Sequence, residues 1–156
     1  MKTQIVREIL RLKEEKNAVI LAHYYAPDEI QEIADFVGDS FYLAKIAKKT
    51  NADIIVFCGV SFMGESAKIL NPDKKVLVPD LTADCPMAHM VAPGKIEQMR
   101  SKYENLAVVC YINSTAELKA KSEHWGKKEK SFLEFDLVLV TMTKSNIPQA
   151  KRSLII

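Results

Sequence analysis

The chain has 156 residues, of which 48% are hydrophobic and 27% are charged, and its formal net charge at pH 7 is +2. These values exclude an intrinsically disordered chain and leave enough residues for a core that folds without disulfides. The small net charge lacks the basic signature of a dedicated nucleic-acid binder. No run of apolar residues is long enough to span a membrane, and the charged N-terminus lacks the apolar core of a signal peptide. We therefore expect a cytoplasmic protein with no nucleic acid or membrane as partner.

Apolar spacing alternates between helix and strand patterns along the first third of the chain. Residues 1–17 place apolar side chains on one face and predict an amphipathic helix, and the apolar run Ala18–Ala22 predicts a strand. Apolar residues recur at helical spacing over 27–37, so we expect a second amphipathic helix that ends at Gly38. Ser40 is the expected cap of a third helix.

The rest of the chain repeats this order of strand and helix. Strands are expected at Ile54–Val60, Lys75–Val78, Leu106–Cys110 and Phe135–Val140, and helices at Ser61–Leu70, from Pro93, and from Ser114, where S-x-x-E forms a capping box. The unbroken apolar run of the first of these strands predicts burial on both faces. The alternation as a whole predicts an α/β fold with a parallel sheet.

Five polar or aromatic residues stand where predicted strands end or predicted helices begin. They are His23, Tyr25, Ser40, Tyr111 and Asn113. The carboxyl ends of parallel strands share one edge of a sheet, and ligands bind there. Helix N-termini at that edge favour anions, so we expect a small, acidic ligand. The histidine could act as acid or base and the other side chains could hold an anion or carbonyl, but a histidine in an apolar strand can equally be a core residue.

The three cysteines occur in two different settings. Cys58 and Cys110 lie inside apolar runs and are expected to be small core residues. Cys85 lies in a loop before a helix, with no C-x-x-C or His/Cys pair beside it. Its local spacing therefore indicates a structural cysteine, and a metal-cluster role would require ligands from distant sequence or another chain.

Three segments together resemble the quinolinate synthase family, the iron–sulfur enzymes of de novo NAD biosynthesis. They are HYYAPDEIQEIADFVGDS, IIVFCGVSFMGESAKILNPDKKVLVPDLTADCPMAHM and VVCYINSTAELKAKS, and the similarity covers Met1 to about Ser122. The resemblance implies αβα three-layer domains around a pseudo-threefold axis with a 4Fe–4S cluster at the centre. Residues 1–84 would form the first domain, and residues 85–122 the cluster-ligand loop and the start of the second.

The resemblance also implies a reaction and roles for individual residues. The family condenses iminoaspartate with dihydroxyacetone phosphate to quinolinate, with loss of phosphate and water. By this similarity His23 binds substrate, Tyr25 is an acid/base group, and Ser40 holds a substrate carboxylate. Tyr111 and Asn113 match a Y-x-N pair that binds the portion derived from iminoaspartate.

The remaining matches concern an apolar wall and the cluster. Phe62 and Met63 match the residues of the family that form an apolar wall against the substrate. Cys85 matches the first of three cysteine ligands of the 4Fe–4S cluster, whose remaining iron is open and acts as a Lewis acid. The resemblance therefore makes Cys85 a ligand although its local spacing does not.

The last part of the chain departs from the family. Residues 123–156 contain none of the family's later cysteines, so we interpret them as an atypical tail, frameshifted or truncated. We expect this chain alone to bind the cluster poorly and to lack activity. A second chain that supplies the missing half is one alternative. The others are a non-catalytic α/β module that binds small anions and a degenerate gene product.

Overall fold

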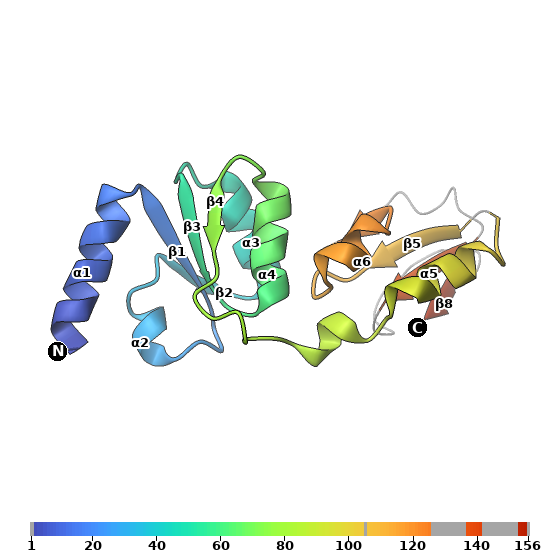
Figure 1. Cartoon of the computed structure of the whole chain (residues 1–156), viewed down its shortest axis with the longest axis horizontal. Coiled ribbons are helices and arrows are strands. Elements are labelled where there is room, and N and C mark those ends of the chain that lie inside the picture. Colours follow the sequence, from blue (N-terminus) through green and yellow to red (C-terminus); the bar gives the residue numbers. More distant parts are fainter. Residues whose placement is uncertain (1, 105, 126–136, 142–152, 156) are drawn as a thin grey trace. The chain divides into compact units, whose positions relative to one another are not determined.

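The chain divides into two compact units, Met1–Asp84 and Cys85–Ile156, in a computed structural model that describes residues 2–104, 106–125, 137–141 and 153–155 (Figure 1). Each unit contains a parallel sheet of four strands with helices packed on it, which confirms the predicted α/β class. Most of the segment 123–156, interpreted as an atypical tail, lies outside the described residues. None of the helices in the described part of the chain is long and apolar enough to span a bilayer.

The first unit is a three-layer arrangement. Its elements are α1 (Lys2–Glu15), β1 (Ala18–His23), α2 (Asp28–Gln31), β2 (Phe36–Gly38), α3 (Ser40–Lys49), β3 (Ile54–Cys58), α4 (Ser61–Leu70) and β4 (Lys75–Leu77). The sheet has the order β2-β1-β3-β4. Helices α1 and α2 lie on one face of this sheet, and α3 and α4 lie on the other (Figure 1).

The core of the first unit lies between the sheet and α3 and α4. Leu21 and Phe57 are neighbours across β1 and β3, and both are fully buried, as are Leu43 of α3 and Phe62 of α4. Each such side chain contributes roughly 1.5–3 kcal/mol of stability when it leaves water. In β3 only alternate residues are fully buried, so the prediction of burial on both faces is wrong. The face toward α1 and α2 is only partly covered.

The segment 27–37 is not a single helix, contrary to the prediction from its apolar spacing. Helix α2 ends at Gln31, and Phe36–Gly38 forms the edge strand β2 beside β1. The cause is Asp35, whose N–H donates to the Ile20 carbonyl at 2.9 Å and whose carboxylate accepts the Ile20 N–H at 2.8 Å. These bonds to a strand distant in sequence outweigh the local helical pattern.

Both expected helix caps are displaced by one residue. Asp39, not Ser40, caps α3, and its carboxylate accepts the N–H of Tyr42 at 2.7 Å. Thr115, not Ser114, caps α6, and its hydroxyl accepts the N–H of Leu118 at 3.3 Å. In each case the expected residue is buried and the neighbouring residue provides the cap.

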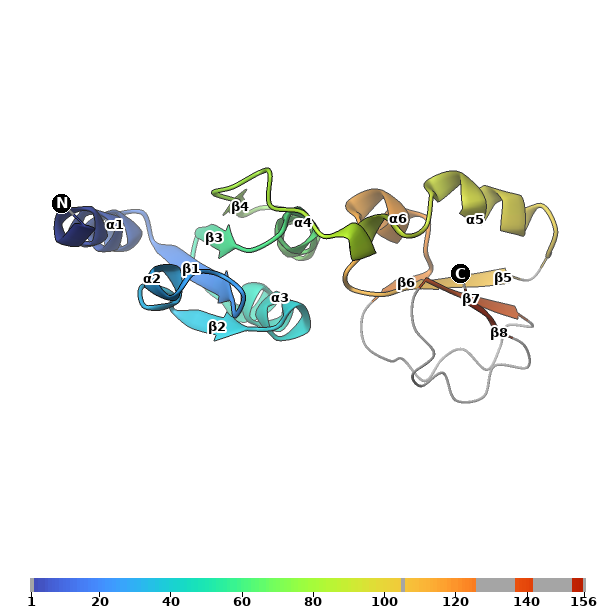
Figure 2. The ribbon, with the colours of Figure 1, turned by 90° about the horizontal axis from the view of Figure 1, so that it is seen from below.

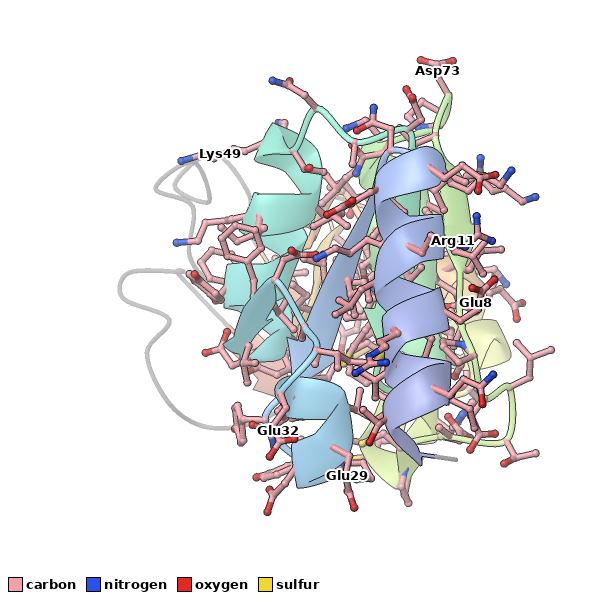
Figure 3. The ribbon with its side chains drawn as sticks, turned by 90° about the vertical axis from the view of Figure 1, so that its left-hand side faces the viewer. Glu8, Arg11, Glu29, Glu32, Lys49 and Asp73 are labelled. Atoms are coloured by element: carbon pink, nitrogen blue, oxygen red, sulfur yellow. The ribbon has the colours of Figure 1, made fainter. Side chains whose placement is uncertain are left out.

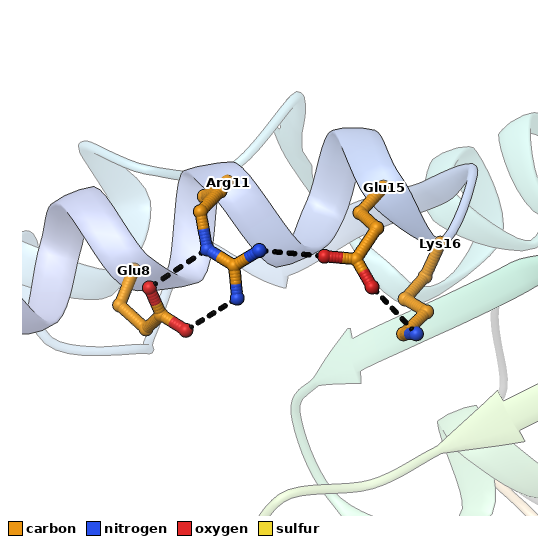
Figure 4. A network of polar contacts seen from close by, with 4 residues as sticks. All are labelled: Glu8, Arg11, Glu15 and Lys16. Atoms are coloured by element: carbon orange, nitrogen blue, oxygen red, sulfur yellow. Dashed lines mark hydrogen bonds and ion pairs between the residues drawn. The ribbon is translucent and has the colours of Figure 1, made fainter.

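The outer surface of α1 carries a chain of ion pairs (Figure 4). Arg11 bonds both carboxylate oxygens of Glu8 and one of Glu15, and Lys16 pairs with Glu15. Hydrogen bonding to Arg11 lowers the pKa of Glu8. The labelled charged side chains of this unit point away from the sheet into solvent (Figure 3). Exposed pairs of this kind contribute little to stability, so this network belongs to the helix surface.

The second unit begins with the 3₁₀ helix η1 (Pro86–His89) and α5 (Pro93–Arg100). They are followed by β5 (Leu106–Cys110), α6 (Ala116–Ala120), β6 (His124–Trp125), β7 (Leu137–Thr141) and β8 (Ser153–Ile155), in the sheet order β6-β5-β7-β8. Alternate residues of β5 pack with α5 and α6 in one cluster, so both helices cover the same face of the sheet (Figure 2). Strand β7 (Leu137–Thr141) includes residues 137–140 of the strand predicted at Phe135–Val140, and the first two residues of that prediction lie outside the described part of the chain.

Helix α4 approaches the chain after β4 so closely that residue 64 must be small. A Cβ atom on Gly64 would overlap Cγ2 of Val78. We expect Gly64→Ala to lower the free energy of unfolding by about 1–3 kcal/mol, because overpacking costs more than the helix propensity of alanine returns. Urea unfolding measures this effect. In the double variant Gly64→Ala/Val78→Ala the overlap is absent and the loss should shrink; an unchanged loss would contradict this cause.

Candidate functional site

The carboxyl edge of the first sheet gathers several of the residues singled out from the sequence. Strand β1 ends at His23, which lies opposite Gly38 at the end of β2. Helix α3 begins directly afterwards at Ser40, and α4 begins at Ser61, just after β3. Because the strands are parallel, His23 and the N-termini of both helices lie at the same edge.

His23 is the first of three neighbouring aromatic rings. Its ring stacks on Tyr24 at a centroid distance of 4.4 Å and meets the edge of Tyr25 at 4.7 Å. The backbone N–H of Tyr25 donates to Nδ1 of His23 at 3.2 Å. In the neutral imidazole Nδ1 is then the acceptor and Nε2 carries the hydrogen, so Nε2–H is the group offered to a ligand.

The loop after β1 is held by one side chain. Nε2 of Gln31 donates to the carbonyls of Tyr24 at 3.1 Å and of Ala26 at 2.8 Å. The Tyr25 side chain is 80% exposed, so its phenol is free to meet a ligand from solvent. Backbone atoms of this loop are therefore ordered by α2, while the Tyr25 ring projects outward.

The electrostatic surroundings of His23 favour its neutral form. Burial lowers the pKa of the imidazole below its ordinary value, and the nearby Asp39 carboxylate partly opposes this shift. With Nδ1 engaged by the Tyr25 N–H, the neutral imidazole can donate its Nε2 proton, as an acidic or ligand-binding histidine requires.

Gly59, just after β3, lies close to both α4 and His23. A Cβ atom on Gly59 would lie 2.9 Å from Sδ of Met63 and 3.5 Å from Cβ of His23, so glycine allows these elements to approach. Phe62 and Met63 are only 2% and 3% exposed. Both are therefore core residues, and their expected contact with substrate stays a prediction.

The two helix N-termini differ in how their polar groups are used. At α4, the N–H of Ser61 donates to the Ala83 carbonyl at 2.9 Å, and its hydroxyl donates to Asp84 at 3.3 Å. At α3, the Asp39 carboxylate accepts the N–H of Tyr42, and Ser40 is the first residue and is 9% exposed. The loop before residue 85 therefore already occupies the first groups of α4.

The second unit carries Tyr111 and Asn113 just after β5 and before the cap of α6. Both residues are half-buried. Among the described residues, Oδ1 of Asn113 is buried without a hydrogen-bond partner. A buried amide oxygen of this kind is costly unless a donor meets it, so it marks a place where a ligand N–H or O–H would be stabilised.

The three cysteines differ in burial: Cys110 is buried, whereas Cys58, which was expected in the core, and Cys85 are half-buried. Burial raises the pKa of Cys58 and Cys110, which lie in β3 and β5. Cys85 is half-buried and precedes η1. In the part of the chain that the structure describes, no three His, Cys, Asp or Glu side chains cluster closely enough to hold a metal ion. These residues therefore do not form a complete cluster site.

Sequence reasoning missed three residues that shape this edge. Tyr24 stacks on His23, Asp39 caps α3 and acts on the charge of His23, and Gly59 admits Met63. The Gly38-Asp39-Ser40 tripeptide could have indicated the cap, because aspartate is a preferred capping residue. Nothing local indicates the role of Gly59.

Together the fold and this edge define an α/β protein with a candidate small-ligand site at the ends of parallel strands. Comparison with known sequences makes the assignment specific: the chain belongs to the quinolinate synthetase A protein family, which it matches over residues 7–132. The family match thus extends past Ser122, where the similarity was expected to end.

Proteins named quinolinate synthase are similar in sequence to most of this chain. It is 58% identical over 120 residues to the protein of Caldicellulosiruptor saccharolyticus, covering 77% of this chain and 40% of the relative. For Fusobacterium nucleatum the identity is 63% over 112 residues, covering 72% and 38%. For Methanocaldococcus jannaschii it is 60% over 124 residues, covering 79% and 40%. The chain therefore spans about 40% of the length of these relatives.

The charge of Asp39 offers a test of the electrostatics around His23. Asp39→Asn removes the negative charge but keeps a side-chain oxygen that can cap α3. We expect the pKa of His23 to fall further, because burial then acts without the opposing carboxylate. An NMR pH titration of the imidazole measures this. Asp53→Asn, which removes a charge just before β3, at the opposite end of that strand, should leave His23 unchanged; a rise in pKa in Asp39→Asn would contradict the assignment.

Proposed function

We propose that this chain supplies part of the substrate site of a quinolinate synthase, a transferase that condenses iminoaspartate with dihydroxyacetone phosphate. The family membership and the identity to named quinolinate synthases support the proposal. The observation that carries it is His23, whose Nδ1 is engaged by Tyr25 N–H and whose Nε2–H is left for a ligand beside the N-terminus of α3. Both substrates are small anions, which suit such an edge.

In the proposed site the first unit binds and orients an acidic substrate. The Nε2–H of His23 donates to a substrate oxygen, and the exposed phenol of Tyr25 gives or takes a proton there. Ser40, at the start of α3, holds a substrate carboxylate together with the helix N-terminus. Phe62 and Met63 would form the apolar wall of the site, and Met63 lies close to Gly59, which also lies close to His23.

The second unit would bind the portion derived from iminoaspartate. Tyr111 and Asn113 follow β5, and the unpartnered Oδ1 of Asn113 is an acceptor. An imine N–H is a donor that would satisfy this oxygen, whereas a carboxylate would not. We assign the amide oxygen of Asn113 to the imine nitrogen of the substrate.

Cys85 is the residue that would serve as a ligand of a 4Fe–4S cluster. It is half-buried and has a neighbouring helix start, but the described residues supply no second or third ligand beside it. The other ligands would come from the part of the protein that the relatives have beyond the segment matched here, or from a second chain. The roles proposed for His23, Tyr25 and Ser40 do not depend on the cluster. A cytoplasmic location stays a prediction.

A chimera tests the proposal directly. Residues 7–122 of this chain replace the matching segment of the quinolinate synthase of Methanocaldococcus jannaschii, to which the chain is 60% identical. We expect the chimera to form quinolinate under anaerobic conditions, and His23→Ala and Tyr25→Phe to lower kcat by about 10²–10⁴-fold, the usual contribution of a general acid or base.

Two further proteins make this comparison decisive. The 156-residue chain alone should form no measurable quinolinate, because its described residues hold one candidate cluster ligand. Asp53→Asn, a change just before β3 at the edge of the sheet opposite to His23, should leave the chimera active. A folded chimera without activity, or activity that survives His23→Ala, would overturn the proposal.

Small-anion binding without catalysis is a second candidate function. It is favoured by the anion-binding features of the first unit, which are complete without any metal: His23 Nε2–H and the N-terminus of α3. Titration of the chain with phosphate and malate tests it. We expect Ser40→Ala and His23→Ala each to weaken binding by about 10–100-fold, as loss of a hydrogen bond to a charged group does. Equal binding by wild type and both variants would exclude this site.

A further inference from the structure

In each of the two units an acidic residue directly precedes the edge strand and binds the neighbouring strand: Asp35 before β2 and Glu123 before β6. Paired residues of the β1–β2 and β5–β6 ladders are related by a constant shift: Leu21 to Val109 and Phe36 to His124 are each 88 residues apart (109 − 21 and 124 − 36). The same shift relates Asp35 to Glu123. The register of the two edge strands is therefore identical in the two units.

Asp35 forms the first rung of the ladder in the first unit. Its N–H donates to the Ile20 carbonyl at 2.9 Å, and its Oδ2 accepts the Ile20 N–H at 2.8 Å. Its other carboxylate oxygen, Oδ1, accepts from Lys13 of α1 at 2.7 Å. The Asp35 side chain thus accepts the Ile20 N–H of β1 just before β2 begins. It also binds Lys13 and so links α1 to the sheet.

Glu123 makes the equivalent three contacts in the second unit. Its N–H donates to the Val108 carbonyl at 3.0 Å, and its Oε2 accepts the Val108 N–H at 2.5 Å. Its Oε1 pairs with Arg100, the last residue of α5. The sequences around the two acids share little, so the common geometry comes from the chemistry: a carboxylate, a strand and a basic residue of the preceding helix.

The two ladders lead to the two pairs of candidate site residues. In the first unit the ladder ends where the N–H of Tyr24 donates to the Gly38 carbonyl at 3.2 Å, with His23 opposite Gly38 and Ser40 two residues later. His23 and Tyr25 shifted by 88 residues give Tyr111 and Asn113. A slip of one residue in either ladder would turn the side chains of the edge strand to the opposite face.

We propose that Asp35 and Glu123 are positioning residues, which lock the register of the two edge strands and thereby place His23 and Tyr25 in one unit and Tyr111 and Asn113 in the other. Asp35 also sets the distance from His23 to Ser40, because the chain runs from β2 directly into α3. The consequence for catalysis rests on the proposed function, whereas the effect on the site residues does not.

The test compares Asp35→Ala with a variant that destabilises the same unit elsewhere. Gly64→Ala perturbs the packing of α4 on Val78 and touches neither β1 nor β2. In the full chain, hydrogen exchange of the Ile20 and Tyr24 amides and the NMR signals of the His23 ring and the Tyr25 amide are recorded for both variants.

We expect Asp35→Ala to accelerate exchange of both amides more than tenfold and to shift the His23 and Tyr25 signals, because the ladder loses its first rung. Gly64→Ala, adjusted to the same fraction unfolded with urea, should leave those signals as in the wild type. Site signals that move equally in the two variants, or in neither, would overturn the proposal and leave Asp35 a merely stabilising residue.

Milder variants keep the test informative if Asp35→Ala does not fold. Asp35→Asn keeps an oxygen for the Ile20 N–H but loses the ion pair, and Lys13→Met removes only the ion pair. Both should retain the ring signals of His23 more closely than Asp35→Ala does. A Lys13→Met protein whose His23 signals move as far as those of Asp35→Ala would show that loss of the ion pair, and not loss of the bond to Ile20, is the cause.

The second unit provides a reciprocal control. Glu123→Ala should accelerate exchange at Val108 and shift the Tyr111 and Asn113 amides while His23 stays unchanged, and Asp35→Ala should do the reverse. Failure of these results would refute the positioning role even if the chimera is active. An inactive chimera, in contrast, would refute the proposed function and leave the positioning role standing.

Discussion

The bond pair between Asp35 and Ile20 is the constraint on which the first unit's site depends. It converts a segment with helical spacing into an edge strand, and that strand carries the chain to the start of α3. Without it, nothing in the local sequence would place Ser40 beside the end of β1. A half-buried carboxylate can do this because it accepts a backbone N–H and a lysine at once, and neither of its oxygens is left unsatisfied.

The buried core of the first unit lies directly beside the candidate site residues at the end of β1. Fully buried residues such as Leu21 and Phe57 supply the stability of the sheet. One residue beyond the buried run, His23 is half-buried, and the same desolvation that stabilises the core lowers its pKa. Tyr25, two residues further on, is exposed. Exposure to solvent therefore increases along the end of β1, and His23 lies at the point where partial burial lowers its pKa.

Each unit carries one pair of candidate ligand residues on the same type of loop, yet the two pairs differ chemically. His23 and Tyr25 supply a proton donor and an exposed phenol, whereas Asn113 supplies a buried acceptor without a partner among the described residues. Two units with the same edge-strand register can carry different donors and acceptors in this way while they keep a common backbone. Cys85 adds a thiol at the start of the second unit, and the relatives extend well beyond the part that this chain matches.

The sequence by itself determined the helices and strands whose apolar residues follow a clear pattern of burial. Helix α4 at Ser61–Leu70 and strand β5 at Leu106–Cys110 have the predicted bounds, because long apolar runs and amphipathic spacing are satisfied by only one kind of element. The positions of His23 and Tyr111 at strand ends followed from the same runs. The tertiary structure decided how segment 27–37 divides, which residue caps α3, and that Phe62 and Met63 are buried. Those outcomes depend on hydrogen bonds and contacts between residues distant in sequence, such as Asp35 with Ile20, which no local pattern encodes.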